Sequence, residues 1–284
     1  MYIYVALLYA LVVGFNDVFK KKACQKSNPI AILVIYTSVA FLLSLSIIPF
    51  GVAVPFKFFL ILALKGFIIT FDWFIILTML KKVNISLVMA LKLVSILLTF
   101  IIGVTVFEET ASTVQFVGIF LVIFGITAIS LINKKEDNKV KTIHIVLLLI
   151  AALITTTSEV LDKYTTTYLT NFQVQFWYLM STAFFSWVFF LIHCLVSKKM
   201  LLQKSDLKNY WSYIVGALLF VSNLLLFGAY RMPGSEMIII TVLSKLNVLI
   251  TVFAGILIFK EKNIWLKILL TAIIILGTIL IALF

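Results

Sequence analysis

Residues 90–100 read ALKLVSILLTF, and residues 243–253 read LSKLNVLITVF. Each stretch carries one lysine, Lys92 or Lys245, among side chains that a lipid bilayer would accept, and a leucine follows each lysine directly. A charge at the centre of a membrane helix costs roughly 2.5–3.5 kcal/mol on insertion scales. Its occurrence in two similar stretches indicates a duplicated membrane helix whose lysine has a function.

The composition around these stretches excludes a soluble globular protein. Of 284 residues, 63% are hydrophobic and 12% are charged, whereas soluble domains are roughly half apolar and about a quarter charged. Apolar runs of about 20 residues, enough to cross a hydrocarbon core of roughly 30 Å, recur along the chain. The sequence predicts an all-α polytopic membrane protein with about ten transmembrane helices, multi-pass in the plasma (cell inner) membrane. The spans are expected at residues 1–20, 30–50, 57–80, 84–107, 112–132, 143–162, 172–196, 209–230, 235–259 and 264–284.

The two halves of the chain resemble each other at constant spacings. NDVFKK (16–21) matches SEVLDK (158–163). Since each half has an odd number of spans, the second half must enter the membrane in the opposite orientation. We therefore expect two inverted five-helix repeats, residues 1–132 and 143–284, joined by a linker at 133–142; this is the architecture of many secondary transporters. A further constant offset relates Thr99, Gly103, Phe107, Glu109 and Gly125 to Thr251, Gly255, Phe259, Glu261 and Gly277.

Lysines gather in alternate loops. The loops after the odd-numbered spans hold most of the 23 basic residues, including those of NKKEDNKVKT (133–142) and SKKMLLQKSDLKN (197–209). By the positive-inside rule these loops are cytoplasmic, which places both termini outside. Topology and anionic lipid then explain the net charge of +12, so the lipid bilayer is the expected partner and no nucleic acid is expected.

The residues that could support enzyme chemistry are sparse. The two cysteines and two histidines are isolated from one another, which argues against a metal cluster or a disulfide framework. No G-x4-GK[ST] phosphate-binding loop occurs in the sequence, which argues against ATP hydrolysis by this chain. We expect no enzyme activity and no cofactor, with transport that could be coupled to a proton or ion gradient.

Ten short-looped helices in two inverted halves resemble the drug/metabolite transporter superfamily, specifically its EamA-like branch. The resemblance covers essentially the whole chain and rests on several short motifs. They are GFNDVFKK (14–21), the Phe-x-Glu endings at Glu109 and Glu261, the pair Gly118 and Gly125, and LSKLNVLITVFAGILIFKEK (243–262). Leu270 stands where the second half would need a partner for Gly118. Family members move amino acids, drugs, sugar phosphates, nucleotide sugars or polar lipid precursors, so the resemblance implies transport without naming the substrate.

Lys92 and Lys245 are the first candidates for a binding site. Two pseudo-symmetric ammonium groups near the midplane could bind a substrate carboxylate or phosphate. The alternative is that each lysine pairs with a buried acid or extends towards a water-filled vestibule. Because ionisable groups inside membranes are usually functional, we favour the first interpretation.

Asp72 is the natural counter-charge, near the middle of its span. It could neutralise Lys92, bind a substrate ammonium, or carry a coupling proton, since a carboxyl group in a low-dielectric medium binds protons more readily. A structural ion pair and a substrate role are equally compatible with the sequence. Lys65, seven residues earlier on the same helical face, lies nearer the span's end, and we expect it to reach towards the interface.

Asp17 and Glu159 stand four residues before Lys21 and Lys163, the spacing of helical ion pairs. One interpretation is that both acids mark solvated helix ends. The other is that they form a pair of gates, one on each side of the membrane, because an inverted repeat duplicates gates as well as sites.

Further polar and aromatic side chains near mid-span could line a substrate pathway, although core packing or interhelical hydrogen bonds would explain any one of them. These candidates are Trp73, Asn223, Asn247, Tyr36 and Tyr178.

The function expected from these features is secondary transport of a small polar metabolite, an amino acid or related zwitterion, by alternating access. Lys92 and Lys245 would hold its acidic group. The protein would act as a monomer or weak dimer. The alternative within transport is an exporter of organic anions, sugar phosphates or other metabolites. From a different class, a non-transport membrane enzyme or assembly protein remains the rival.

Overall fold

The computed structural model describes residues 1–284 except 107–111, 137–139, 199–201, 261–262 and 284. All elements in the described part of the chain are helices, which confirms the predicted all-α class. The first half contains α1 (Tyr2–Lys26), α2 (Pro29–Ser44), the 3₁₀ helix η1 (Leu45–Phe50), α3 (Phe56–Lys82), α4 (Ile85–Lys92), α5 (Val94–Val106) and α6 (Thr113–Glu136). The second half contains α7 (Thr142–Tyr168), α8 (Asn171–Ser197), the short α9 (Lys204–Leu207), α10 (Tyr210–Arg231), α11 (Met237–Ser244), α12 (Asn247–Leu257) and α13 (Ile264–Leu283).

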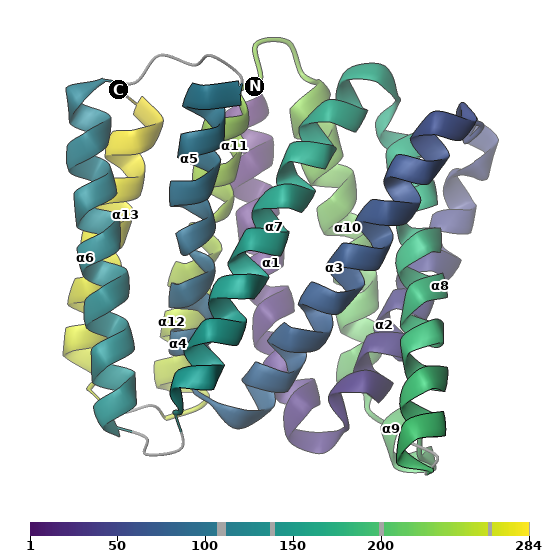
Figure 1. Ribbon diagram of the computed structural model, residues 1–284, viewed down its shortest axis with the longest axis horizontal. Coiled ribbons are helices and arrows are strands. Elements are labelled where there is room, and N and C mark those ends of the chain that lie inside the picture. The colour runs from purple at the N-terminus through teal and green to yellow at the C-terminus, as the bar shows by residue number, and fades with distance from the viewer. Residues whose placement is uncertain (107–111, 137–139, 199–201, 261–262, 284) are drawn as a thin grey trace.

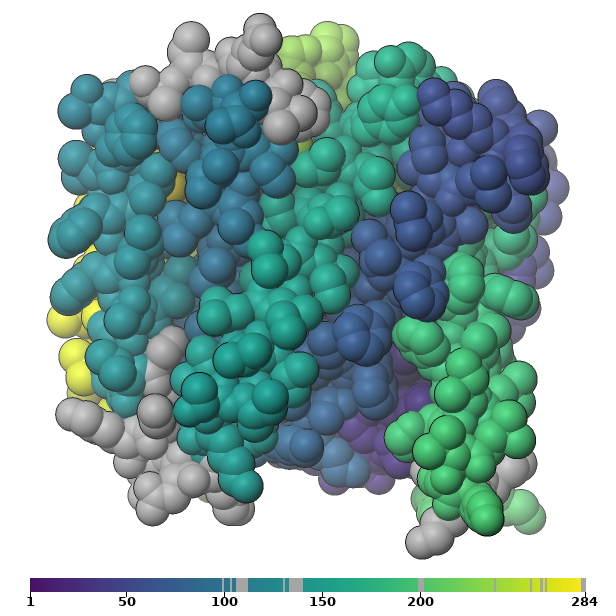
Figure 2. All heavy atoms as spheres, viewed as in Figure 1, coloured from purple at the N-terminus to yellow at the C-terminus, as the bar shows by residue number. Residues whose placement is uncertain are grey.

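The helices are suited to a membrane by length and composition. Within the described residues, 7 helical segments are long and apolar enough to cross a bilayer, and shorter apolar segments follow at Thr113–Ile129, Ile239–Gly255 and Trp265–Ile281. Each expected span coincides with one of these segments. The outer face formed by α6, α7, α3 and α8 carries many exposed apolar side chains, as a surface facing lipid requires (Figure 2). The prediction of a polytopic membrane protein is confirmed.

Two of the expected spans are broken. The span predicted at 84–107 consists of α4 and α5, and the span predicted at 235–259 consists of α11 and α12. Each break lies at the lysine of the repeated motif: the first follows Lys92, at Leu93, and the second comprises Lys245 and Leu246. The positions of these two spans agree with the prediction, whereas the break inside each was not predicted. Since no glycine or proline lies within four residues of either break, the usual causes of a helix break are missing there.

Backbone hydrogen bonds explain how the chain tolerates the first break. The amide of Leu93 donates to Ala90 O, and that of Ile96 donates to Leu93 O, both in tight 3₁₀-type turns. The carbonyl of Lys92 accepts instead from the Ser95 hydroxyl at 2.8 Å. A side chain thus satisfies a backbone group that water could not reach.

The broken helices lie in the middle of the bundle. α4 packs against α12, and α5 packs against α11, so the two breaks lie close to one level (Figure 1). α1, α3, α7 and α10 surround them, while α6 and α13 form a tight pair at one end. In that pair, a Cβ added to Gly118 would lie 2.6 Å from the carbonyl oxygen of Gly277. Both chain termini lie on one face of the molecule, as the loop charges predict (Figure 1).

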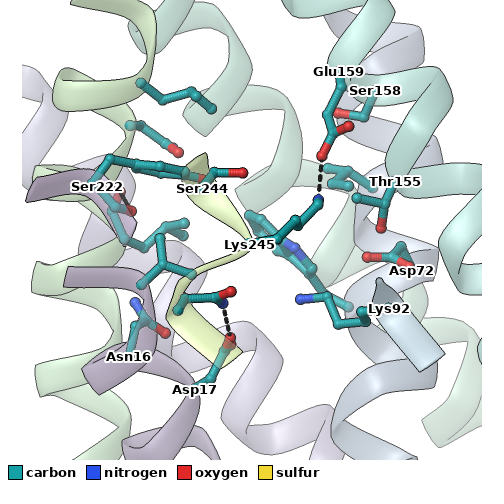
Figure 3. Close-up of a pocket in the computed structure, with 18 of the residues that line it drawn as sticks. Asn16, Asp17, Asp72, Lys92, Thr155, Ser158, Glu159, Ser222, Ser244 and Lys245 are labelled. Atoms are coloured by element: carbon teal, nitrogen blue, oxygen red, sulfur yellow. Dashed lines mark hydrogen bonds and ion pairs between the residues drawn. The ribbon is translucent and has the colours of Figure 1, made fainter. Parts of the chain in front are cut away.

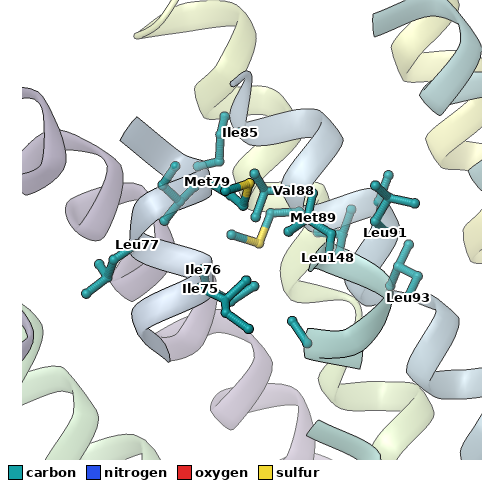
Figure 4. Close-up of a cluster of buried hydrophobic side chains, with 14 of the residues drawn as sticks. Ile75, Ile76, Leu77, Met79, Ile85, Val88, Met89, Leu91, Leu93 and Leu148 are labelled. Atoms are coloured by element: carbon teal, nitrogen blue, oxygen red, sulfur yellow. The ribbon is translucent and has the colours of Figure 1, made fainter. Parts of the chain in front are cut away.

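An apolar cluster holds α4 in place. Side chains from the end of α3 interlock with those of α4 and with Leu148 of α7, as Figure 4 shows. Met89 and Leu91 on α4 are at most 4% exposed. Because such close packing restricts the helix to one position, it also places Lys92, the last residue of α4. The cluster contains Ile75, Ile76, Leu77, Met79, Ile85, Val88, Met89, Leu91, Leu93 and Leu148.

Candidate functional site

A polar cavity of about 130 Å³ lies where the two breaks meet. Side chains from α1, α3, α4, α7, α8, α10, α11 and α12 line it, so both halves of the chain contribute (Figure 3). At roughly 10–15 Å³ per water site, such a volume holds on the order of ten waters or one small metabolite. Its walls are far more polar than the lipid-facing surface of the same helices.

Four lysines and four acids line this cavity, so their formal charges balance. Most of them form ion pairs. Lys20 pairs with Asp17 at 3.2 Å, Lys245 pairs with Glu159 at 2.6 Å, and Lys65 pairs with Asp162. The charged lining residues are Lys20, Lys65, Lys92, Lys245, Asp17, Asp72, Glu159 and Asp162.

Lys92 and Asp72 are the two charges left over. Within the part of the chain that the structure describes, neither forms an ion pair within 4.0 Å, and they are not paired with each other. Asp72 is 2% exposed, and its Oδ1 has no hydrogen-bond partner among those residues. In Figure 3 the Lys92 ammonium points into the cavity between Asp17 and Asp72. Of the alternatives that the sequence left open, a closed Asp72–Lys92 ion pair is the one that this geometry does not contain.

Several neutral groups of the cavity also keep hydrogen-bonding capacity. Asn247 Nδ2 donates to Asp17 at 3.1 Å, but its Oδ1 has no partner in the described residues. The same holds for Asn16 Oδ1, Asn223 Nδ2 and Thr155 Oγ1. Buried polar groups usually find partners. These unpaired atoms therefore give the cavity both donors and acceptors for a ligand.

Asp17 and Glu159 do not mark solvated helix ends. α1 continues to Lys26 and α7 continues to Tyr168, beyond the span ends expected from hydropathy, so both acids lie inside their helices. Asp17 is fully buried. Their ion-pair partners are Lys20 and Lys245, not the lysines four residues later that the spacing predicted.

The expectation for Lys65 was wrong. Its side chain is only 1% exposed and does not reach the interface. The ammonium group pairs with Asp162 and lies 3.6 Å from the ring centroid of Tyr178 and 5.0 Å from that of Phe227. The depth of a residue within its own helix could not reveal an acid on a neighbouring helix.

The aromatic candidates divide into lining and supporting residues. Trp73 and Tyr178 line the cavity, as do Asn223 and Asn247. Tyr36 does not: it is fully buried behind Trp73, with the two ring centroids 5.5 Å apart. Tyr36 therefore supports the wall without lining it.

Sequence reasoning missed several lining residues. Asp162 is the most important, because it neutralises Lys65. A signal for it existed: it lies one helical turn after Glu159, on the same face of α7. The others are polar residues of α1, α7 and α10, whose single occurrences carry no pattern. They are Tyr9, Asn16, Lys20, Thr155, Ser158 and Ser222.

Comparison with known proteins agrees with this architecture. Residues 1–131 match the model of the EamA-like transporter family. The first half of the chain is EamA-like. The resemblance to the drug/metabolite transporter superfamily is confirmed over these residues, and with it the expectation of a multi-pass membrane protein of a transporter family. The family motif endings at Glu109 and Glu261 lie outside the described residues.

Solved structures share the fold of this chain. A crystal structure, described only as that of a protein, superposes with a TM-score of 0.67 over 95% of both chains, at 11% sequence identity. At such low identity the likeness concerns the fold alone. No curated protein matches the chain.

Proposed function

We propose that this protein is a secondary transporter of a small zwitterion, an amino acid or a close relative. The observation that carries the proposal is the pair of leftover charges, Lys92 and Asp72, in a cavity whose other charges are paired. A substrate with one carboxylate and one ammonium group complements both. The carboxylate would bind Lys92, and the ammonium would bind Asp72.

Charge balance favours a zwitterion over an anion. A buried charge without a partner costs several kcal/mol, whereas a paired one can be tolerated. A net-neutral ligand adds no uncompensated charge to a cavity whose formal charges already cancel. An organic anion or sugar phosphate would instead add negative charge to the cavity. This alternative substrate class would fit only if Asp72 held a proton and was therefore neutral.

The two broken helices support the proposal of inverted repeats at 1–132 and 143–284 with a linker at 133–142. Lys92 and Lys245 lie at corresponding breaks, and the two broken spans run in opposite directions (Figure 1). Discontinuous helices at the interface of inverted repeats are typical of secondary transporters, and substrates bind beside their breaks.

The ion pairs suggest how alternating access could operate. In the second half Lys245 is joined to Glu159 on α7. The corresponding pair in the first half, Lys92 with Asp17 on α1, is open, because Asp17 is bound by Lys20 and Asn247. If the two halves exchanged their conformations, the Asp17–Lys92 pair would close and the Glu159–Lys245 pair would open. Asp17 and Glu159 would thus act as alternating gates. The membrane in which they act would be the plasma membrane or another bilayer.

The test is uptake of small solutes into proteoliposomes. Alanine has both charged groups, propionate lacks the ammonium, and ethylamine lacks the carboxylate. We expect uptake or binding of alanine or another zwitterionic amino acid, with both truncated analogues at least tenfold weaker. If propionate or a sugar phosphate is bound as well as any amino acid, the organic-anion alternative replaces this proposal.

A further inference from the structure

Lys65 occupies a site with the chemistry of an organic-cation pocket. Its ammonium pairs with the Asp162 carboxylate and lies 3.6 Å above the ring centroid of Tyr178, with the Phe227 centroid at 5.0 Å. A carboxylate beside aromatic ring faces is how proteins bind ammonium ligands. Here a side chain of the protein itself fills that position.

This pocket is part of the cavity and not a separate ion pair in the packed core. Lys65, Asp162, Tyr178 and Phe227 all line the cavity. The rings of Tyr178 and Phe227 meet edge to face, with centroids 6.0 Å apart, so two walls of the pocket are held rigidly. A ligand in the cavity would therefore lie next to the Lys65 side chain.

We propose that Lys65 is a specificity-determining residue, a tethered cation that keeps amines out of a cation subsite formed by Asp162, Tyr178 and Phe227. The proposal rests on the proposed function in treating the cavity as the substrate site. It adds that monoamines are excluded while zwitterions are accepted. Asp72 would bind the ammonium of a zwitterion, whereas Asp162, the second carboxylate that could bind a cation, is already occupied by Lys65. Glu159, one helical turn before Asp162 and bound to Lys245, adds negative potential beside the same subsite.

Charge balance provides the control. Removing the Lys65 ammonium leaves the cavity with one uncompensated carboxylate, so a cation should bind. Removing the Asp162 carboxylate as well restores the balance, so the cation should no longer bind. The Lys65→Ala variant also leaves a space of matched shape, because the atoms lost are those of n-propylammonium.

The experiment measures binding of n-propylammonium by thermal shift of the purified full-length protein. We expect the Tm of Lys65→Ala to rise by about 3 °C or more at ten times Kd. The wild type and the Lys65→Ala/Asp162→Ala variant should not shift, and neither should Lys65→Ala with neutral n-propanol. A shift of the wild type, or no shift of folded Lys65→Ala, would overturn the proposal.

Two further measurements address folding and transport. If Lys65→Ala does not fold, Lys65→Gln replaces it, with methylammonium as the probe and Lys65→Gln/Asp162→Asn as the charge-balanced control. Absence of methylammonium binding to folded Lys65→Gln also overturns the proposal. Proteoliposomes with the folded variant should accumulate n-propylammonium, and wild-type proteoliposomes should not. Binding without uptake would make the pair purely structural and refute the specificity role. Because amine binding does not depend on amino acid uptake, failure of the proposed function would be recognised separately.

Discussion

Replacing Lys92 by methionine should weaken substrate binding strongly while leaving the fold intact. The ammonium forms no ion pair within 4.0 Å among the described residues, so its removal breaks no direct ion pair. The variant would, however, lose the hydrogen bond between the Lys92 ammonium and the substrate carboxylate. A hydrogen bond to a charged group contributes roughly 1.5–3 kcal/mol to the free energy of binding. At 1.4 kcal/mol per factor of ten, the Kd for a zwitterionic amino acid should rise about 10- to 150-fold.

The assay is isothermal titration calorimetry with purified protein, accompanied by thermal unfolding to verify the fold. Lys92→Arg is the matched control, because it keeps the positive charge and should retain most of the affinity. A folded Lys92→Met variant whose Kd stays within threefold of wild type would refute the assignment of Lys92 to the substrate carboxylate.

Other substitutions test the remaining parts of the site and fold. Asp72→Asn should weaken binding of a zwitterion about tenfold or more in the same titration, yet leave any weak binding of an amine-free carboxylate unchanged; equal losses for both ligands would contradict the assignment. Lys245→Met should lower stability by about 3–5 kcal/mol, because it breaks the largely buried Glu159–Lys245 ion pair, and Lys245→Met/Glu159→Gln should recover most of it in thermal unfolding. Gly118→Ala should destabilise the α6–α13 pair by about 1–3 kcal/mol through overpacking, whereas Gly228→Ala, where an added Cβ meets nothing within 4 Å, should not; similar unfolding temperatures for the two variants would count against this packing.

The sequence allowed prediction of the spans and of several charged and polar cavity residues, because both follow from local chemistry. Long apolar runs can only cross the membrane as helices. A mid-span charge must face the bundle interior, which brought Lys92, Lys245 and Asp72 to one cavity. The repeat then indicated that the two lysines lie at related positions.

What could not be predicted depends on contacts between distant helices. The breaks at Leu93 and at Lys245–Leu246 occur without a nearby glycine or proline, and side-chain hydroxyls such as that of Ser95 satisfy the backbone there. Lys65 was assigned to the interface because Asp162, its partner, lies on another helix. Tyr36 was placed in the pathway by its register, although Trp73 separates it from the cavity. Pairing across a bundle is not encoded in the spacing along one helix.

The most direct measurement is the affinity of the wild-type protein for alanine, propionate and ethylamine, or for the matching trio of whichever amino acid binds best, measured under one set of conditions. If the Lys92–Asp72 cavity is a zwitterion site, the amino acid binds and each truncated analogue is at least tenfold weaker. Equal affinity for the amino acid and its amine-free analogue would contradict the central claim.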